Sequence, residues 1–486
     1  MEIFKTAVRI ERTSKSSIFS QVSKGVVDII QRGVLKPNDR LPSVRKLAGI
    51  LDIHARTVVA AYEDLEAQGW IETLPRKGVF VSSVLPTIKP IKLRQNNEAR
   101  MDRPTSHESG ERNQKLKTST KSDLIVDDGF PDHRLAPTDL ILREYRRLMK
   151  KSYAIRAATF SEYTGSEELR VVLSKFLRET RALPIDESNL CVTRGAQMGL
   201  YLICRTYLKK GSKVLVGEPN YRFANDLFKE CGAKLIGVPV ENDGIDTNRI
   251  AQICAKQKPD LLYIIPHHHH PTTVTLSPQK RIALLEIVEK YRLMVIEDDY
   301  DYDFHYASSP ILPLASYMKG QDVFYLGSLS KAISNALRIG FICATPSAIE
   351  RISQLRRLVD LRGDTFFELA MSYFIKEGEF ARHLKRMNRI YKDRRDLMYE
   401  MMHNNLGDRI TLVKPTGGMA LWTTFHKSID LKSVSAKAQE MGLVISDGTF
   451  YNTSNLNLNS TRFGFASKDE REIHQFVDIL QTLLKR

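Results

Sequence analysis

The sequence predicts two parts: a small helical head that ends in a β-hairpin, and a large α/β body with a mostly parallel sheet. Apolar residues recur at helical spacing up to residue 68, a polar and basic stretch follows residue 82, and apolar strands alternate with amphipathic helices from residue 124 onward. A chain of 486 residues is also too long for one ordinary hydrophobic core. We therefore expect at least two domains.

The head, residues 14–82, begins with a helix in the segment 14–33, where apolar residues recur every three or four positions. Ser43 is a good N-cap for a second, short helix, and a third runs from about Ala55 to Gln68. Two short strands, WIET and GVFV, follow and are joined by LPRK. This order of elements is typical of a winged helix-turn-helix.

In the stretch after the head, residues 83–122, basic residues outnumber acidic ones. Its larger part, RQNNEARMDRPTSHESGERNQKLKTSTKS, contains almost no large apolar side chains. Such a segment buries too little surface to offset the entropy of ordering it, so we expect a flexible basic linker. The net charge of the whole chain is +16. A basic excess favours a polyanion as partner, because each neutralised phosphate releases counterions. Charge alone is equally compatible with an ordinary solvated surface, so the motifs must decide.

The body, residues 123–486, contains six apolar runs that predict strands: NLCVT, SKVLVGE, AKLIGVPV, DLLYIIP, RLMVIEDD and VFYLGSL. Helical patterns such as GLYLICRTYLKK and PQKRIALLEIVEKYR lie between them. This alternation predicts a mostly parallel sheet with crossover helices.

Several classes of protein are disfavoured by the sequence. No apolar run is long enough to span a membrane, and the N-terminal segment lacks the apolar core of a secretion signal. The five cysteines are scattered and never spaced as C-x-x-C, which predicts reduced cytoplasmic thiols and no zinc site. Four consecutive histidines, residues 267–270, predict a polar loop at the edge of a pocket and no metal site.

The stretch GVLKPNDRLPSVRKLAGILDIHARTVVAAYEDLEAQGWIETLPRKGVFV resembles the head of GntR-type bacterial regulators, without a gap in helix order or wing. The resemblance implies seven contacts with operator DNA: Arg40, Ser43 and Arg45 at the second helix, Arg56 and Thr57 at the start of the recognition helix, and Lys77 and Gly78 at the wing tip. An arginine in the major groove can pair bidentately with guanine. Each residue alone could simply cap or solvate the head, whereas the group favours DNA binding. The family often has Ser-Arg-Asn-Thr at residues 54–57, where this chain has His-Ala-Arg-Thr, so the base preference is not implied.

Five motifs of the body contain candidate ligand-binding residues. In chain order they are GEPNYRF, IIPHHHHPTTVT, IEDDYDYDF, GSLSKAISNALRIG and STRFGFAS. A pyridine aldehyde that carries a phosphate needs an amine, an acid for its ring nitrogen, donors for the phosphate and a face to stack on. Lys331 with Arg338 seven positions later, and Asp298 at the end of a strand, supply the amine, the anion donor and the acid. From Asp127 onward the chain resembles fold-type-I aminotransferases.

That resemblance implies pyridoxal 5′-phosphate as cofactor and Lys331 as the lysine that forms the imine (Schiff base) with it. Asp298 would pair with the pyridinium nitrogen, Tyr300 with the ring hydroxyl oxygen, and Tyr221 would stack on the ring. The other implied contacts are Gly195, Ala196, Gln197, Ser328, Ser330 and Arg338 for the phosphate, His268 beside the ring, Arg462 for an effector carboxylate, and Tyr163 for the phosphate of a neighbouring subunit. Thr273 replaces the usual glycine of the histidine motif, and threonine tolerates positive φ poorly.

A GntR-like head joined to an aminotransferase-like body resembles the MocR/GabR subfamily of transcriptional regulators. This resemblance implies a head-to-tail homodimer and an effector that is an amine, an amino acid or the cofactor itself. Two alternatives stay open: a working aminotransferase with an appended head, and a GntR regulator that binds a different ligand. The same residues would support a residual half-reaction with an amino donor.

Overall fold

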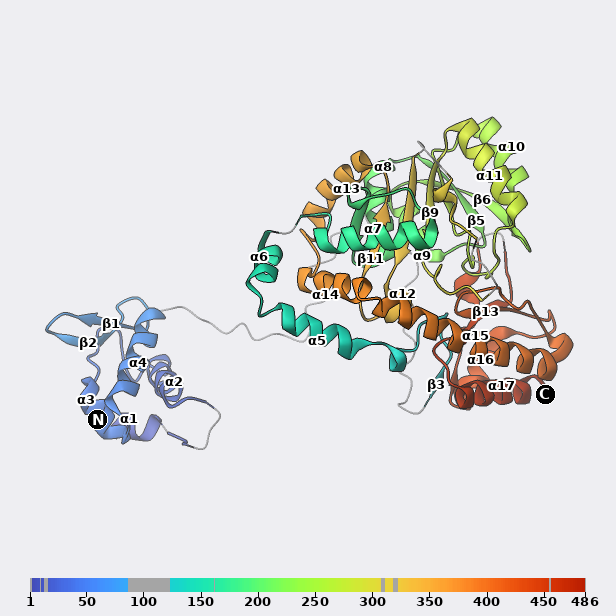
Figure 1. The fold of residues 1–486 in the computed structure, drawn as a ribbon. Helices are drawn as coiled ribbons and strands as arrows, with labels where there is room; N and C mark the ends of the chain where they lie inside the picture. The colour runs from blue at the N-terminus through green and yellow to red at the C-terminus, as the bar shows by residue number, and fades with distance from the viewer. Residues whose placement is uncertain are drawn as a thin grey trace. The chain divides into compact units, whose positions relative to one another are not determined.

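The computed structural model describes residues 2–8, 10–12, 16–85, 123–160, 162–306, 311–317, 322–453 and 456–485 (Figure 1). The chain divides into two units, residues 1–113 and 114–486. From residue 86 onward, the predicted linker lies outside the described residues. The five cysteines are buried and free of disulfides. Within the described ranges, no helix combines the length and the apolar character that a membrane crossing requires.

The head has the predicted order of elements. Its helices and strands are α2 (Ile18–Gln31), α3 (Val44–Leu51), α4 (Ala55–Ala67), β1 (Ile71–Leu74) and β2 (Gly78–Val81), and the two strands pair antiparallel. An additional helix, α1 (Glu2–Ala7), precedes residue 14 and was not expected. Phe4 of α1 and the neighbouring Val8 are buried in the same core as Val26, Leu47 and Val58. The core of the head therefore includes residues before its predicted start.

The central sheet of the body has eight strands in the order β4-β11-β10-β9-β8-β5-β6-β7. Their bounds are β4 (Leu190–Thr193), β5 (Lys213–Glu218), β6 (Lys234–Glu241), β7 (Gly244–Ile245), β8 (Leu261–Ile264), β9 (Met294–Asp299), β10 (Val323–Ser328) and β11 (Gly340–Cys343). The six predicted strands are all present, and β5, β6, β8, β9 and β10 run parallel. The sequence analysis did not predict β11, which lies antiparallel between β4 and β10.

Helices cover both faces of this sheet (Figure 1). Buried side chains of α8 (Ala196–Tyr207), α9 (Arg222–Glu230) and α13 (Pro346–Val359) form one cluster with the strands, and those of α10 (Thr247–Gln257) and α11 (Pro278–Tyr291) form a second. Leu261 belongs to the first cluster and Leu262 to the second, because successive side chains of a strand point to opposite faces. Burial on both faces explains the continuous apolar runs of the strands.

The remaining helices of the body are α5 (Thr138–Leu148), α6 (Ser152–Phe160), α7 (Glu167–Arg181), α12 (Ser330–Ile333), α14 (Thr365–Lys376), α15 (Glu379–Leu406), α16 (Leu431–Glu440) and α17 (Glu470–Lys485). A second, antiparallel sheet contains β12 (Ile410–Leu412), β13 (Ala420–Phe425) and β15 (Ser460–Gly464). The first strand of the body, β3 (Leu124–Ile125), pairs with β14 (Leu443–Val444), and the amide of Gly464 donates to the carbonyl of Asp127 at 2.8 Å. These contacts bring residues 127–130 to the C-terminal strand β15.

Candidate functional site

Lys331 lies in α12, directly after β10 ends at the carboxyl edge of the parallel strands. Its ammonium nitrogen Nζ donates to the carbonyl of Gly129 at 3.0 Å and lies 4.6 Å from the ring centre of Phe130. Burial lowers the pKa of Lys331, the carboxylates of Asp128 and Asp301 oppose that shift, and the charge of Arg462 adds to it. A lowered pKa leaves more of the neutral amine, which is the nucleophilic form.

Asp298 is the penultimate residue of β9 and is buried. The hydroxyl of Tyr263, on the neighbouring strand β8, donates to its Oδ2 at 2.7 Å, whereas its Oδ1 has no hydrogen-bond partner among the described residues. Burial raises the pKa of Asp298 to about 7. The hydrogen bond from Tyr263 opposes this shift, and the charges of Asp299 and Asp301 add to it. A buried acceptor without a partner is costly, and a cationic N–H group would satisfy it. Asp298 therefore fits a protonated pyridine nitrogen.

Gly195 caps the N-terminus of α8 with a φ of +81°, and Ala196 and Gln197 are the first residues of that helix. A Cβ atom at residue 195 would lie 2.6 Å from Nη2 of Arg338, so this exposed guanidinium rests against Gly195. Ser328, ten residues before Arg338, is the last residue of β10 and is half-buried. Free amides at a helix N-terminus next to an arginine form a site for an anion. This arrangement fits a phosphate group.

Ser330 is buried and bonds to the backbone of the loop that carries Arg338. Its hydroxyl donates to the carbonyl of Leu337 at 2.6 Å and accepts from the amide of Ile339 at 2.9 Å. With its one proton used in this way, Ser330 positions Arg338. A direct bond from Ser330 to a phosphate stays a prediction.

The contact between Gly195 and Arg338 gives a test of the anion site. We expect Gly195→Ala to weaken binding of pyridoxal phosphate at least about tenfold, because the new Cβ displaces Arg338, and to cost roughly 1 kcal/mol of stability from the positive φ. Gly211→Ala is the matched control: residue 211 has a φ of +90°, and among the described residues no atom outside residues 210–212 lies within 4 Å of the place its new Cβ would take. Equal cofactor affinities of the two variants in a fluorescence titration would contradict this assignment.

Two tyrosines predicted to contact the ring lie close to this region. The hydroxyl of Tyr300 donates to the carbonyl of His268 at 3.1 Å, and its ring centre is 5.7 Å from Nζ of Lys331. The ring of Tyr221, at the start of α9, is 5.0 Å from that of His270 in an edge-on arrangement. Burial raises the pKa of both hydroxyls, so both tyrosines stay protonated. Their contacts with a cofactor stay predictions.

His268 forms its hydrogen bond with Asp301 and not with Lys331. Its Nδ1 is 2.9 Å from Oδ1 of Asp301, and a Cβ atom at Gly417 would lie 2.0 Å from its Nε2. The turn of the histidine motif forms although Thr273 replaces glycine: Thr273 has a φ of +60°, and its amide bonds to the carbonyl of His269. His268 orients Asp301, one of the carboxylates that act on Lys331. Its predicted contact with the cofactor ring stays a prediction.

Arg462, the predicted clamp for an effector carboxylate, holds a carboxylate of its own chain. Its Nε is 2.8 Å from Oδ1 of Asp128, and its Nη1 donates to the carbonyl of Pro271 at 3.0 Å. Nε2 of His270 and the hydroxyl of Tyr451 also bind Asp128, at 2.8 and 2.7 Å. We call these four residues, Asp128, His270, Tyr451 and Arg462, the Asp128 cluster.

The sequence analysis missed Asp128 and His270. The available signals were the acidic pair before Gly129 and the fourth histidine of the tetrad. Both residues are coupled electrostatically to Lys331: Asp128 raises the pKa of Lys331, and Lys331 lowers the pKa of His270. The Asp128 cluster and Lys331 therefore belong to one site.

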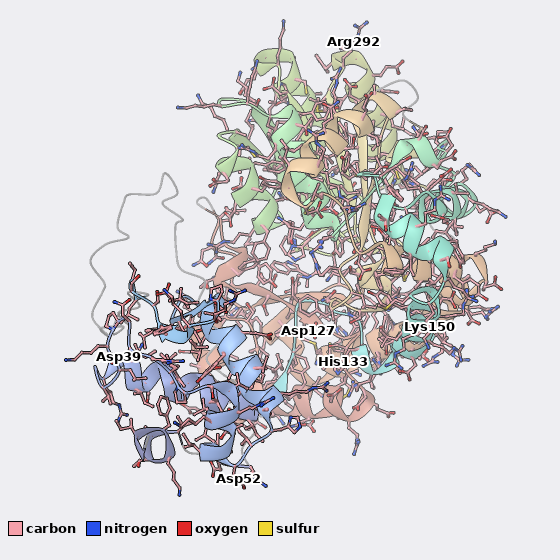
Figure 2. All side chains as sticks on the ribbon, turned by 90° about the vertical axis from the view of Figure 1, so that its left-hand side faces the viewer. Asp39, Asp52, Asp127, His133, Lys150 and Arg292 are labelled. Atoms are coloured by element: carbon pink, nitrogen blue, oxygen red, sulfur yellow. The ribbon has the colours of Figure 1, made fainter. Side chains whose placement is uncertain are left out.

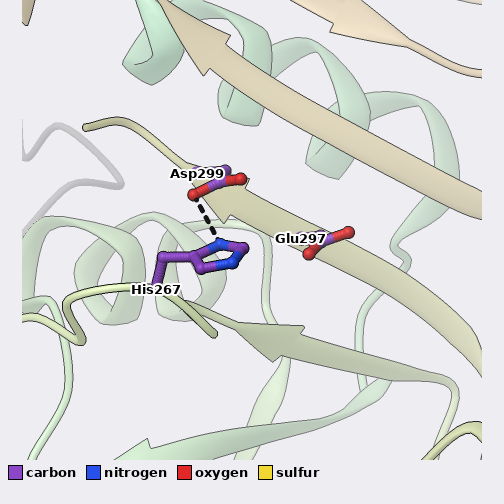
Figure 3. A group of neighbouring side chains, drawn as sticks. All are labelled: His267, Glu297 and Asp299. Atoms are coloured by element: carbon purple, nitrogen blue, oxygen red, sulfur yellow. Dashed lines mark hydrogen bonds and ion pairs between the residues drawn. The ribbon is translucent and has the colours of Figure 1, made fainter. Parts of the chain in front are cut away.

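His267, Glu297 and Asp299 are close enough together to hold a metal ion (Figure 3). Their donor atoms are already engaged. Nδ1 of His267 is 3.0 Å from Asp299, and the two oxygens of Glu297 accept from the amides of Leu314 and Ala315 at 2.8 Å. Asp299 also accepts from the hydroxyl of Tyr325, so we assign these side chains to a buried polar network.

Among the candidate DNA-contacting residues of the head, Arg40 and Ser43 lie just before α3, and the others lie on α3, on α4 and in the β-hairpin. Arg40, Ser43, Arg45, Arg56 and Lys77 are exposed, and Thr57 is half-buried. Ser43 is the N-cap of α3, and its side chain makes no capping bond. The structure adds Arg76, exposed in the turn of the hairpin with a φ of +63°, which the sequence analysis left out.

Two further contacts shape this surface of the head. Gly78 has a φ of +116°, and a Cβ there would lie 3.2 Å from Nε of Arg40, so glycine lets Arg40 lie against the wing. Nδ1 of His54 accepts from the amide of Arg56 at 3.2 Å and caps α4. Figure 2 labels Asp39, which precedes Arg40, and Asp52, which ends α3. His54, one of the three residues that depart from the family pattern, thus fixes the start of the recognition helix.

Two family models match the chain: "Aminotransferase class I and II" over residues 136–480 and "Bacterial regulatory proteins, gntR family" over residues 20–81. Among curated relatives, the regulator TauR of Rhodobacter capsulatus is 27% identical, with 93% of each chain covered. The probable rhizopine catabolism regulatory protein MocR of Rhizobium meliloti is 26% identical, with 85% of this chain and 83% of the relative covered.

Solved aminotransferases share the fold of the body. The kynurenine aminotransferase of Pyrococcus horikoshii, in complex with PMP, is 25% identical with a TM-score of 0.70, covering 75% of this chain and 91% of its own. LysN of Thermus thermophilus, complexed with N-(5′-phosphopyridoxyl)-L-leucine, is 26% identical with a TM-score of 0.69, covering 75% and 92%. The unpartnered Oδ1 of Asp298 and the contact between Arg338 and Gly195 fit the same cofactor, pyridoxal phosphate. The chain thus belongs to the class I and II aminotransferase family through residues 136–480 and carries the DNA-binding domain of GntR-family bacterial regulators at residues 20–81.

Proposed function

We propose that the protein is a transcriptional regulator that binds operator DNA through its head and responds to a primary amine, an amino acid or pyridoxal phosphate itself in its body. The observation that carries this proposal is the presence, in one chain, of a winged helix-turn-helix with exposed basic residues and of Lys331 beside an acid with an unpartnered oxygen. MocR and TauR, which match over both parts of the chain, are named as regulators. Because bacterial operator DNA lies in the cytoplasm, we also propose that the protein acts there.

When bound, pyridoxal phosphate supplies an aldehyde carbon that primary amines attack and a ring that withdraws electrons from it. Because burial lowers the pKa of Lys331, a larger fraction of its neutral amine would be available to attack that carbon. Oδ1 of Asp298 would keep the proton on the ring nitrogen, and Tyr263 holds Asp298 in place. Arg338 and the N-terminus of α8 would hold the phosphate.

A ligand with a primary amine would compete with Lys331 for that carbon. Lys331 binds the carbonyl of Gly129 and faces Phe130, and these residues follow soon after residue 123, where the described body begins. An amine that displaces Lys331 would therefore change contacts in the segment that leads to the head. Such a ligand alters DNA binding only if it binds the two arrangements of the protein with different affinity.

A working aminotransferase is the second candidate, because the same residues of the body would serve it. Two measurements separate the candidates: steady turnover of an amino donor with a keto acid, and the affinity for an operator selected from a random pool of duplex DNA, with and without that donor. A regulator shows a changed operator affinity with little or no turnover. Turnover without any change in operator affinity would contradict the proposal.

Arg56 gives the sharpest test of the DNA-binding surface. We expect Arg56→Ala to weaken operator binding at least about tenfold, because a bidentate contact with a base contributes about 1–3 kcal/mol. Arg32→Ala is the control, since Arg32 is also exposed in the head but pairs with Asp28 at 3.4 Å. Gel-shift titration at one salt concentration measures both. Loss of affinity in Arg32→Ala but not in Arg56→Ala would contradict the assignment.

We also propose a head-to-tail homodimer. Phe160 at the end of α6 and Leu358 in α13 are each 77% exposed, and the guanidinium of Arg362 donates to the carbonyl of Thr159 at 2.9 Å, so these two segments meet. Exposed apolar side chains of this size favour a protein interface. Tyr163, 40% exposed, would reach the phosphate of the neighbouring subunit from this region. Sedimentation analysis of the native protein and Phe160→Asp tests the proposal; a native monomer would contradict it.

A further inference from the structure

The position that would bind the carboxylate of an amino acid already contains one. Arg462 is only 3% exposed, and its Nε pairs with Oδ1 of Asp128 at 2.8 Å. The same oxygen accepts from Tyr451, and Oδ2 accepts from His270. Displacing Asp128 from Arg462 would leave a second negative charge beside the incoming one. An effector carboxylate at this position therefore meets repulsion from the chain itself.

Asp128 is ionised and remains within reach of a ligand. Burial favours its neutral form, but the interactions of Asp128 with His270, Arg462 and Tyr451 outweigh burial and hold the pKa of Asp128 below its usual range. Its side chain is still 35% exposed. The carboxylate is thus a fixed negative charge with accessible surface.

His270 provides a second, independent indication. It is 5% exposed, and burial lowers its pKa, which favours the neutral ring; a neutral ring paired with Asp128 through Nε2 donates from that nitrogen. A neutral imidazole that donates through Nε2 has an acceptor at Nδ1. Within the described residues, this Nδ1 has no hydrogen-bond partner. An acceptor next to an anion suits a ligand that brings N–H donors.

The charges around Lys331 point in the same direction. Among the charged groups that act most strongly on Lys331 are three carboxylates, those of Asp128, Asp301 and Asp127, and one cation, Arg462. This surplus attracts a cationic ligand and disfavours a second anion.

From this geometry we propose that Asp128 makes the site selective for amines that lack a carboxylate next to the reactive nitrogen, with preference for those that carry a second cationic group. The inference rests on the proposed function, since it names the class of amine that the body binds. Asp128 acts as a specificity-determining residue: it occupies Arg462 and attracts the cationic end of the ligand.

Agmatine and L-arginine are suitable probes, because each has one primary amine and they differ only by the carboxylate beside it. We expect agmatine to change the visible absorbance of the cofactor-loaded protein at a concentration at least about tenfold lower than L-arginine does, which corresponds to about 1.4 kcal/mol. Tyramine and L-tyrosine repeat the comparison without a second cation. We expect the same order of preference with weaker binding of tyramine than of agmatine.

Asp128→Asn keeps the shape of the side chain and frees Arg462 from its charged partner. We expect this variant to lose the preference for agmatine, with L-arginine binding at least about tenfold more tightly than to the native protein. Asp393→Asn, at an exposed position on α15, is the control for an unrelated loss of charge. The absorbance of each variant before ligand is added verifies that the cofactor site is intact, and operator affinity gives a second readout of the same ligands.

The outcomes separate this inference from the proposed function. If the native protein responds to L-arginine or L-tyrosine at the same or lower concentrations than to the matching amines, the selectivity is refuted and an amino-acid sensor remains. If the preference for agmatine persists in Asp128→Asn, the selectivity stands and only its assignment to Asp128 is refuted. If none of the four compounds changes absorbance or operator affinity, both the selectivity and the response to amines are refuted.

Discussion

Lys331→Ala should abolish the visible absorbance of the purified protein and its response to amines, while operator binding by the head persists. The variant loses the amine that joins the chain to the cofactor, so we expect the affinity for pyridoxal phosphate to fall at least about 100-fold, or about 2.7 kcal/mol. Because the pKa of Lys331 is lowered by burial, removing this side chain should change the stability of the cofactor-free protein by no more than about 1 kcal/mol. Dialysis followed by absorbance spectroscopy measures the first effect, and urea unfolding the second.

Two variants control this experiment. Lys331→Arg keeps a cation but cannot join the cofactor, so it should behave like Lys331→Ala in absorbance. Lys385→Ala removes an exposed lysine of α15 and should behave like the native protein. A coloured, amine-responsive Lys331→Ala protein would show that another group holds the cofactor, and it would refute the assignment.

Asp298→Asn should have opposite effects on cofactor binding and on stability. An amide cannot balance the charge of a pyridinium, so we expect the affinity for pyridoxal phosphate to fall at least about 100-fold. The cofactor-free variant should be more stable than the native protein at pH 8, because burial of the carboxylate is unfavourable in the absence of a cationic partner.

The pH dependence of that gain in stability follows from the raised pKa of Asp298, about 7 against a usual value of 3.8. Between these pH values, the unfolded chain has released a proton that the folded, cofactor-free protein retains, so the native free energy of unfolding falls by up to about 1.4 kcal/mol per pH unit. The difference between Asp298→Asn and the native protein should thus grow from pH 5 to pH 7, reach roughly 2–4 kcal/mol, and stay constant above. Urea unfolding at several pH values measures it. A difference independent of pH would contradict the burial of Asp298 without a cationic partner.

Much of the fold could be predicted because its elements are marked locally. The six strands are continuous apolar runs, as expected for a parallel sheet buried on both faces, and the head has capped helices and a short hairpin. The helix α1 and the strand β11 were missed because each is short, and β11 directly follows the motif that contains Lys331 and Arg338. Periodicity alone cannot tell a strand in a short apolar run from a buried helix segment.

The Asp128 cluster could not be predicted from local patterns. Its four residues come from distant segments, which are joined by the pairing of β3 with β14 and by the bond from Gly464 to Asp127. Figure 2 labels Asp127, the residue before Asp128. Among four consecutive histidines, spacing cannot indicate which one faces the site; the structure shows that His270 contacts Asp128 and Tyr221. Arg462 was predicted to bind the carboxylate of an effector. In the structure it pairs with the carboxylate of Asp128, a partner that the sequence analysis did not predict.

The central claim is that the reaction of amines at Lys331 controls the affinity of the head for operator DNA. The most direct test records the cofactor absorbance and the operator affinity of the native, cofactor-loaded protein in one titration with agmatine, and repeats it with Lys331→Ala. We predict that both signals change with the same midpoint in the native protein and that neither changes in the variant. An absorbance change that leaves operator affinity constant, or an affinity change that persists without Lys331, would contradict the account.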